Sequence, residues 1–377
     1  KILNFFIMEK NPNQVAGNNE NNANVPTASV YNLIILDESG SMSGVTRQTI
    51  TGCNETLNCI RTSAQEDKSM RQFVSIYCFD TEKSRYLMKN APIEDINDIT
   101  ARDYSPNGCT PLYDAIGNTV SELKTIAHDS ETTAKVTIIT DGMENASRKW
   151  THSAVVEIIE SLKKQGWVFT FIGANIDVER TSRGLGITSF MEFDQTDEGM
   201  HNMFAREISS RRAHSKKMEF MRKSNFYRDA CETDKMEILS ACNENYFTES
   251  VREAPGRIYN LEPNEIFVFG SNIAGNHNGS AAALAVQRFG AVMGQAEGLQ
   301  GQSYAIPSVG TSIAELTEAI NRFTEFVVRN PKYKFMVTAI GCGNAGYTPA
   351  QIAPLFKQAY EFGNVYLPAS FLPYVTD

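Results

Sequence analysis

The sequence predicts an α/β protein with a doubly wound, mostly parallel sheet, followed by a smaller α/β domain. Short apolar runs, typical of buried strands, alternate with longer stretches of helical periodicity. Near residue 257 glycine becomes dense and charge becomes sparse, just after the turn signal Pro255-Gly256. We therefore expect a leader at residues 1–27, a first domain at 28–215, a basic helical connector at 216–256 and a second domain at 257–377.

The expected strands of the first domain are apolar runs of five to seven residues separated by helical patterns. The strands are residues 31–36, 73–79, 84–88, 136–140 and 167–173, and the helices are residues 45–64, 112–123 and 150–165. Pro111 precedes the second helix, where its missing N–H costs nothing. This alternation favours parallel strands joined by helical crossovers.

Composition limits the function classes. The 377 residues are enough for two or three domains, and the net charge of −9 argues against general nucleic-acid binding. The seven cysteines show no metal-finger spacing, which favours reduced thiols and a cytoplasmic location. No stretch is long and apolar enough for a membrane span, and the asparagine-rich leader has too little apolar surface to fold.

Five oxygen-bearing residues far apart in the chain fall at the ends of predicted elements: Asp37, Ser39, Ser41, Thr110 and Asp141. Loops at the carboxyl ends of parallel strands meet at one edge of the sheet. Hydroxyls with few carboxylates suit a small, hard cation, so we predict a site for Mg²⁺ or Mn²⁺. The alternative is that the Asp-x-Ser-x-Ser segment is only a polar turn.

This set resembles the metal-ion-dependent adhesion site of the von Willebrand factor A-type (vWA) family, over residues 28–215. The resemblance implies a Rossmann-like fold in which Ser39, Ser41 and Thr110 reach the metal directly. Asp37 and Asp141 would bind it directly or through water. A carboxylate from an acidic residue of a partner protein would complete the shell. No nucleophile–base pair stands beside the set in sequence, so binding and not turnover is expected.

A basic segment follows at residues 199–223, where the pattern predicts a helix. It carries Arg206, Arg211, Arg212, Lys216, Lys217, Arg222 and Lys223. One interpretation is a solvated helix face. The other is a docking surface for an acidic partner or a nucleic-acid backbone.

In the second domain, strands at 266–269 and 335–340 open into glycine-rich loops, and a third strand is expected at 303–306. A small-residue helix at 280–285 follows the first loop. Backbone N–H groups of such loops, together with a helix start, can hold phosphate. The predicted ligand-binding residues are Asn272, Gly279, Gly341, Gly343, Asn344, Gly346 and Tyr347. The alternative is that the glycines only make turns.

These loops resemble a compact macro domain, the ADP-ribose-binding family, and small macro-like modules of phage and bacterial genomes. The resemblance implies that Asn272 faces a ribose, that Gly341, Gly343 and Gly346 wrap a diphosphate, and that Tyr347 packs on a ribose. The chain departs from the family because no aspartate is placed to select adenine. The only candidates for that role are Asn260, Glu262 and Glu265.

His277 lies in the same loop as Asn272, and the two are the predicted catalytic residues if an ADP-ribosyl bond is hydrolysed. The alternative for His277 is a hydrogen-bonding loop residue.

We therefore expect a two-module protein that grips a partner through a bridging metal and binds, or hydrolyses, an ADP-ribose-type nucleotide. Two alternatives are a non-enzymatic assembly factor of a phage or bacterial system, in which both domains bind only proteins, and a nucleic-acid-associated protein that uses the basic helix.

Overall fold

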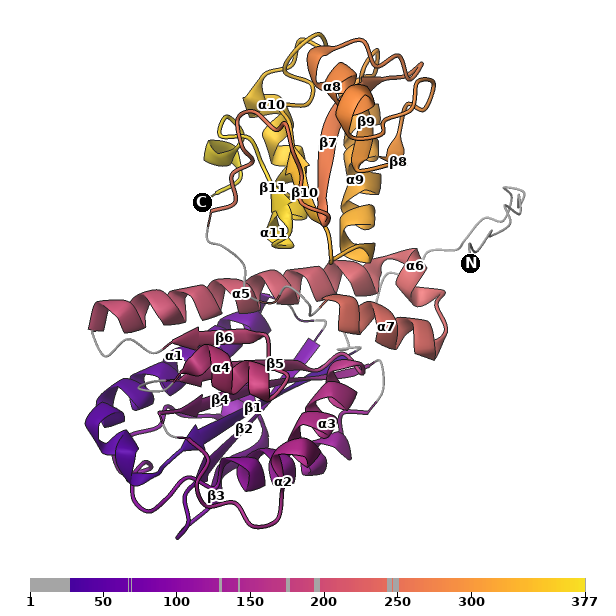
Figure 1. The fold of residues 1–377 in the computed structure, drawn as a ribbon. Coiled ribbons are helices and arrows are strands. Elements are labelled where there is room, and N and C mark those ends of the chain that lie inside the picture. The colour runs from indigo at the N-terminus through magenta and orange to yellow at the C-terminus, as the bar shows by residue number, and fades with distance from the viewer. Residues whose placement is uncertain are drawn as a thin grey trace, which may run out of the picture.

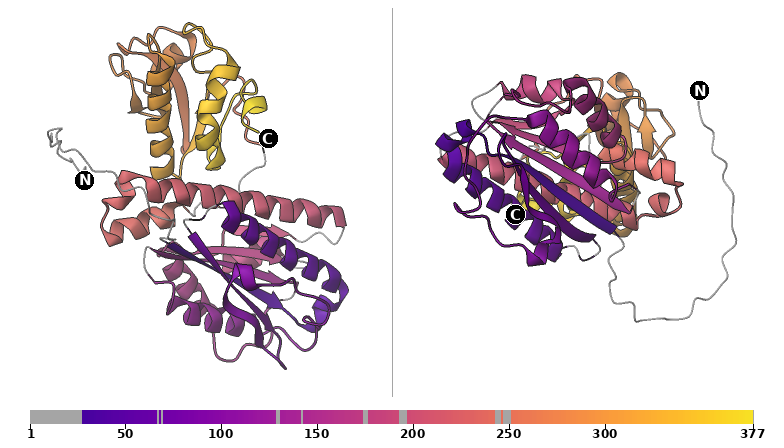
Figure 2. Two further views of the ribbon diagram at one scale, coloured as in Figure 1. Left: turned by 180° about the vertical axis from the view of Figure 1, so that it is seen from behind. Right: turned by 90° about the horizontal axis from the view of Figure 1, so that it is seen from below.

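A computed structural model shows two α/β units on either side of the long helix α5 (Asp197–Lys223), as the views from the front and from behind agree (Figure 1, Figure 2). The structure describes residues 28–66, 68, 70–128, 131–141, 143–173, 177–192, 197–242, 246 and 251–376. The predicted leader at 1–27 lies outside them. Within the described residues, no helix combines the length and the apolar character needed to cross a bilayer.

The first unit is a six-stranded sheet in the order β3-β2-β1-β4-β5-β6. Its strands are β1 (Ala28–Asp37), β2 (Met70–Phe79), β3 (Arg85–Pro92), β4 (Thr132–Thr140), β5 (Val168–Gly173) and β6 (Ser189–Glu192). All neighbours are parallel except β2 and β3. The fold class predicted from the sequence is confirmed. Strand β6 was not expected, since four residues are too few to show a periodicity.

Helices cover both faces of this sheet. They are α1 (Thr46–Glu66), α2 (Leu112–Lys124), α3 (His152–Lys163) and α4 (Val178–Gly184), with the 3₁₀ turns η1 (Gly40–Val45) and η2 (Ile93–Asp95). Central strand β1 is buried on both sides. Leu33 and Ile35 pack in the cluster that includes α2 and α3, whereas Ile34 and Leu36 pack in the cluster that includes α1. The carboxyl end of β1 is therefore fixed from both faces.

Helix α5 packs on this sheet through buried charges. Arg211 is 2% exposed and pairs with Glu207 at 3.1 Å, and it donates to Asn32 Oδ1 of β1 at 2.6 Å. Other basic side chains of α5 pair within the chain: Arg212 with Glu66, Lys216 with Glu361 and Lys223 with Glu219. These pairs disfavour α5 as a docking surface for an acidic partner or nucleic acid.

Lys135 of β4 lies next to this network and is 5% exposed. Burial, and then the charge of Arg211, lower the pKa of Lys135 to about 7. The unfolded chain therefore binds more protons than the folded one between pH 7 and pH 10.5, so the stability rises with pH across that window. Below pH 7 the cost of protonating a buried lysine is fully present.

We expect Lys135→Met to raise the free energy of unfolding by about 1–4 kcal/mol at pH 6. The gain should shrink towards pH 10, where the lysine is neutral in the native state. Urea unfolding at pH 6, 8 and 10 measures this, with the exposed Lys124→Met as the control that should show no such trend. A loss of stability in Lys135→Met at pH 6 would mean that the buried ammonium has net favourable partners.

The second unit is a five-stranded sheet in the order β11-β10-β7-β9-β8, parallel except between β8 and β9. Its strands are β7 (Glu265–Asn272), β8 (Gly298–Gln300), β9 (Ser303–Val309), β10 (Lys334–Val337) and β11 (Val365–Tyr366). Its helices are α8 (Ser280–Arg288), α9 (Ile313–Arg329), α10 (Pro349–Ile352) and α11 (Lys357–Glu361), with the turns η3 (Ala353–Phe356) and η4 (Leu372–Tyr374). The strand predicted at 335–340 is shorter than expected, and α9 was not expected.

Helices α5, α6 (Asn225–Arg228) and α7 (Glu232–Cys242) join the two units. Met218 and Met221 of α5, with Leu239 of α7, belong to one hydrophobic cluster with residues of the second unit such as Phe323. The Phe220 and Phe362 rings lie 5.3 Å apart. The predicted domain boundary at 215 therefore falls inside a continuous helix that packs on both units.

Candidate metal site and ligand cavity

Two carboxylates meet at the carboxyl edge of the first sheet. Strands β1 and β4 are neighbours with Leu36 opposite Ile139, so Asp37 comes beside Thr140 and Asp141 follows directly. Thr140 donates a hydrogen bond from Oγ1 to Asp37 Oδ2 at 2.5 Å. The strand pairing alone therefore brings together two acids that are 104 positions apart.

The loop after β1 brings two hydroxyls to the same place. Ser39 donates its backbone N–H to Asp37 Oδ1 at 2.8 Å, which turns the chain back over the carboxylate. The Ser39 and Ser41 hydroxyls are 3.1 Å apart, and Ser41 Oγ donates to Asp141 Oδ1 at 2.6 Å. Four of the five predicted residues are thus connected through hydrogen bonds or close contact.

Thr110 is held between the other loops of this edge. Gly40 N–H donates to Gly108 O at 3.1 Å, and Thr110 exchanges hydrogen bonds with Asn145, at 2.9 Å to Asn145 Oδ1 and 3.2 Å from Asn145 N. Thr110 is 2% exposed, and its hydroxyl makes no hydrogen bond to another described residue. Its oxygen lone pairs are therefore not used by the surrounding protein.

The charge of this group has no counter-ion among the described residues. Asp37 is fully buried, and burial, with a smaller contribution from the nearby Asp141, raises its pKa to about 6. Burial also raises the pKa of Asp141. The described residues hold no cluster of three or more His, Cys, Asp and Glu, so a cation here would be held by two acids and three hydroxyls. That donor set fits Mg²⁺ or Mn²⁺.

Glu38 lies between Asp37 and Ser39 in the sequence, but its carboxylate, unlike that of Asp37, is paired with basic side chains. Its side chain is also fully buried, but it pairs with Arg85 and with Lys83 and accepts the backbone N–H of Ser105. Protein cations therefore balance the charge of Glu38, whereas no basic side chain among the described residues pairs with Asp37. The Glu38 contacts connect the site loop to the segment before Thr110, and no local sequence pattern predicts them.

We expect Arg85→Met to destabilise the protein by about 1–3 kcal/mol, because it leaves a buried carboxylate with the partly exposed Lys83 as its only basic partner. Thermal unfolding measures this. Arg322→Met is the matched control, since its pair with Glu297 is largely exposed and should be worth less than about 1 kcal/mol. Equal effects from both variants would contradict this role for Arg85.

The second unit contains a cavity of about 880 Å³ at the carboxyl ends of β7, β9 and β10. Five of the predicted ligand-binding residues line it, namely Asn272, Gly279, Gly341, Gly343 and Asn344. The lining described by the structure does not include His277, Gly346 or Tyr347. Parallel strands thus bring the two glycine-rich loops together, as the sequence predicted.

His277 is placed beneath the loop and not in the cavity wall. It is 2% exposed, with Nδ1 3.3 Å from Ser271 Oγ and its ring edge-on to Phe269. Its Nε2 has no hydrogen-bond partner among the described residues. This placement favours the alternative, a hydrogen-bonding loop residue, over a general acid or base.

Asn272 uses most of its side chain to shape its own loop. Its Oδ1 accepts from the N–H groups of Ala274 and Asn276 at 3.1 and 2.9 Å, and its Nδ2 donates to Asn276 O at 3.2 Å. One amide N–H remains for a ligand. Asn272 is therefore chiefly a positioning residue of the cavity wall.

Gly346 and Tyr347 shape the second loop. Gly346 has φ +77°, which favours glycine, and it donates to Gly343 O at 2.9 Å. Tyr347 donates its backbone N–H to Gly341 O and its hydroxyl to Thr311 O, both at 3.0 Å. The predicted contact of Tyr347 with a ribose has no support in this geometry.

The described lining of the cavity contains no aspartate or glutamate, and Arg257 is its only charged residue. Asn260, Glu262 and Glu265 were the candidates for selecting a base, and none of them lines the cavity. The sequence did not predict the wall that contains Arg257, because Pro255-Gly256 indicates only a domain boundary.

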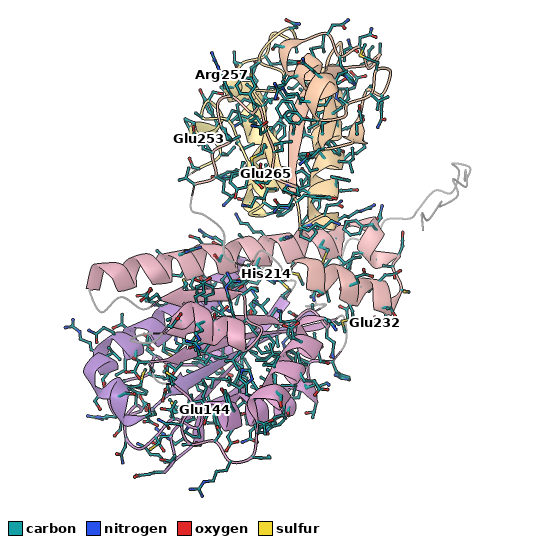
Figure 3. The ribbon with its side chains drawn as sticks, in the orientation of Figure 1. Glu144, His214, Glu232, Glu253, Arg257 and Glu265 are labelled. Atoms are coloured by element: carbon teal, nitrogen blue, oxygen red, sulfur yellow. The ribbon has the colours of Figure 1, made fainter. Side chains whose placement is uncertain are left out.

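The two sites face away from each other. Figure 3 shows Glu144, in the loop after β4, at the end of the first unit far from α5, and Arg257 on the second unit beyond α5. Any influence of one site on the other has to pass through the packed helices α5 to α7.

Comparison with known proteins leaves the function open, because no protein-family model and no curated protein matches the chain. Solved structures similar over 48% of it include a von Willebrand factor type A protein from Catenulispora acidiphila (16% identity, 43% of that chain, TM-score 0.33). A second is the vWF domain of the pili tip protein Mfa5 from Porphyromonas gingivalis, with 10% identity over 48% of this chain and 95% of that chain and a TM-score of 0.34. A third is manganese-loaded TRAP protein from Plasmodium vivax, with 17% identity over 48% of this chain and 74% of that chain and a TM-score of 0.34. The chain spans less than half the length of the Catenulispora protein. At these identities and TM-scores, the function has to be argued from the residues themselves.

Proposed function

We propose that the first unit is a vWA-type domain that binds a protein partner through Mg²⁺ or Mn²⁺ held by Asp37, Ser39, Ser41, Thr110 and Asp141. We propose also that the second unit binds ADP-ribose or a related nucleotide. The observation that carries the first part is the pair of acids at the sheet edge. Neither pairs with a basic side chain of a described residue, although the adjacent Glu38 pairs with two.

The chemistry of the donor set suits adhesion. Three hydroxyls are neutral, so a divalent ion is fully neutralised only if both Asp37 and Asp141 bind it directly. With either acid bound through water, the ion keeps positive charge and an open position. A carboxylate of a partner protein is the ligand that best fills that position. The chain would thus hold its partner through a shared cation.

The cavity of the second unit suits an anion. Its described lining lacks carboxylates, and it includes Gly341 and Gly343, whose missing side chains let a ligand approach the backbone closely. Helix α8 begins at Ser280 after Gly279, which provides no side-chain cap, and its first residues line the cavity. The partial positive charge of that helix start favours phosphate. We propose binding, because no described lining residue is a histidine, cysteine or carboxylic acid.

The metal-bridged function is tested on the Mn²⁺-loaded full chain by water-proton relaxation. A peptide with one glutamate should lower the relaxivity by displacing a metal-bound water, whereas the same peptide with glutamine should not. No uptake of Mn²⁺, or equal effects of the two peptides, would contradict the proposal.

The nucleotide-binding function is tested by the melting temperature with and without ADP-ribose. A ligand at 100 times its Kd should stabilise the native state by about 2.7 kcal/mol. Binding would also exclude the alternative in which both domains bind only proteins. An unchanged melting temperature at millimolar ADP-ribose would contradict the proposal for the second unit.

A further inference from the structure

Arg257 stands out on the wall of the cavity. It is exposed, it is the only charged residue of the described lining, and it forms no ion pair or hydrogen bond with another described residue. Other arginines of the second unit have such partners: Arg322 pairs with Glu297, and Arg288 donates to Tyr259 O. An arginine that faces a cavity without a carboxylate partner, in a chain of net charge −9, is available to an external anion.

The backbone before Arg257 is fixed. Ala254 N–H donates to Leu367 O at 2.8 Å, and Leu367 N–H donates to Arg252 O at 3.1 Å, so this segment extends the sheet beside β11. Arg252 is 5% exposed and donates from its guanidinium to Tyr360 O at 2.5 Å and to Val365 O at 3.3 Å. Figure 3 shows Glu253 and Arg257 on the same flank of the second unit.

The backbone after Arg257 is anchored as well. Ile258 is 8% exposed and packs in a cluster with Phe267 and Phe269 of β7. Arg257, Ile258 and Tyr259 all line the cavity, so the buried side chain of Ile258 fixes the position of Arg257 at the cavity wall. The guanidinium therefore requires only side-chain ordering to meet a ligand, which limits the entropic cost of binding.

We propose that Arg257 is the residue that selects a diphosphate-bearing ligand in this cavity. The inference rests on the nucleotide binding proposed above and adds the basis of its selectivity. The remaining polar groups of the lining are neutral, so they recognise hydroxyls and phosphate oxygens but attract no charge over a distance. The planar guanidinium supplies two parallel N–H donors to a phosphate. Selection then depends on ligand charge, and no carboxylate in the described lining selects adenine.

Calorimetric titration of the full chain with ADP-ribose tests this assignment. Arg257→Gln should weaken binding about 10- to 100-fold, the effect of losing a charge-assisted hydrogen bond. Arg257→Lys should restore part of it, since the charge remains but the fork is lost. Arg322→Gln is the matched control: it removes one positive charge of the second unit that does not line the cavity, and it should leave the affinity unchanged.

Two measurements need no substitution. The affinity of the wild-type chain for ADP-ribose should fall as salt is raised, and inorganic pyrophosphate should compete. A third measurement does use the variant: uncharged adenosine should bind Arg257→Gln and the wild type equally weakly.

The possible outcomes distinguish nucleotide binding by the second unit from the role of Arg257 in that binding. If the wild type binds ADP-ribose but Arg257→Gln binds it as tightly, or if salt has no effect, Arg257 is not the selecting residue and nucleotide binding stands. If the wild type binds no ADP-ribose, nucleotide binding and the role of Arg257 are both wrong.

Discussion

Asp37→Asn is expected to abolish Mg²⁺ binding and at the same time to stabilise the metal-free protein. Asp37 is buried and pairs with no basic side chain in the described part of the chain, and its pKa is raised to about 6. Relative to the ordinary pKa of 3.8 for an aspartate, this corresponds to about 3 kcal/mol of unfavourable free energy at pH 7. Asparagine keeps the shape of the side chain and removes its charge, so the metal-free variant should unfold at a higher temperature than the metal-free wild type. Magnesium should no longer raise the melting temperature of the variant.

Asp114→Asn is the matched control for this prediction. Burial raises the pKa of Asp114, but hydrogen bonds from the backbone N–H groups of Arg148, Trp150 and Lys149 outweigh it, and the net pKa is lowered. Loss of this charge should destabilise the protein and leave Mg²⁺ binding intact. Thermal unfolding of both variants with and without magnesium measures the difference. A destabilised metal-free Asp37→Asn would show that the protein itself already compensates that carboxylate.

Gly343→Asp is expected to abolish nucleotide binding, whereas Gly343→Asn should reduce it little. Gly343 lines the cavity, and a Cβ built on it meets no atom within 4 Å. Its φ lies outside the positive region, so a side chain adds no backbone strain. The aspartate would place a negative charge near the phosphates. At 5 Å and an effective dielectric of 20, one such charge pair costs about 3 kcal/mol, or about 100-fold in affinity.

The comparison of the two Gly343 variants isolates charge from size, and titration with ADP-ribose measures it. Gly346 is a poorer position for such a test, because its positive φ would strain any side chain and because it does not line the cavity. Equal weakening by aspartate and asparagine would indicate a steric effect. Unchanged affinity in Gly343→Asp would contradict an anion-binding cavity.

The meeting of Asp37 and Asp141 at one edge of the sheet was predictable because it follows from strand order. Asp37 and Asp141 end neighbouring parallel strands, so an apolar run followed by an acid was sufficient to bring them together. The pair between Glu38 and Arg85 was not predictable in the same way. It joins the start of the site loop to an antiparallel edge strand, and neither the pairing of β3 nor its register is written in local sequence.

The cavity was predicted in outline and misassigned in detail. Strand ends and glycine runs located the two loops, but which side chains of a loop face inwards depends on its internal hydrogen bonds. His277 and Tyr347 point to protein partners, although their sequence positions look like those of cavity residues. The burial of Arg211 in α5 was not predicted for a related reason, since its partner Asn32 is distant in sequence.

Calorimetric titration of the full chain with Mg²⁺, and then with Mn²⁺, tests the central claim most directly. We predict saturable uptake of one divalent ion per chain by the wild type, lost in Asp37→Asn and retained in Asp114→Asn. Absence of uptake of either ion by the wild type would contradict a metal-bridged function for the first unit.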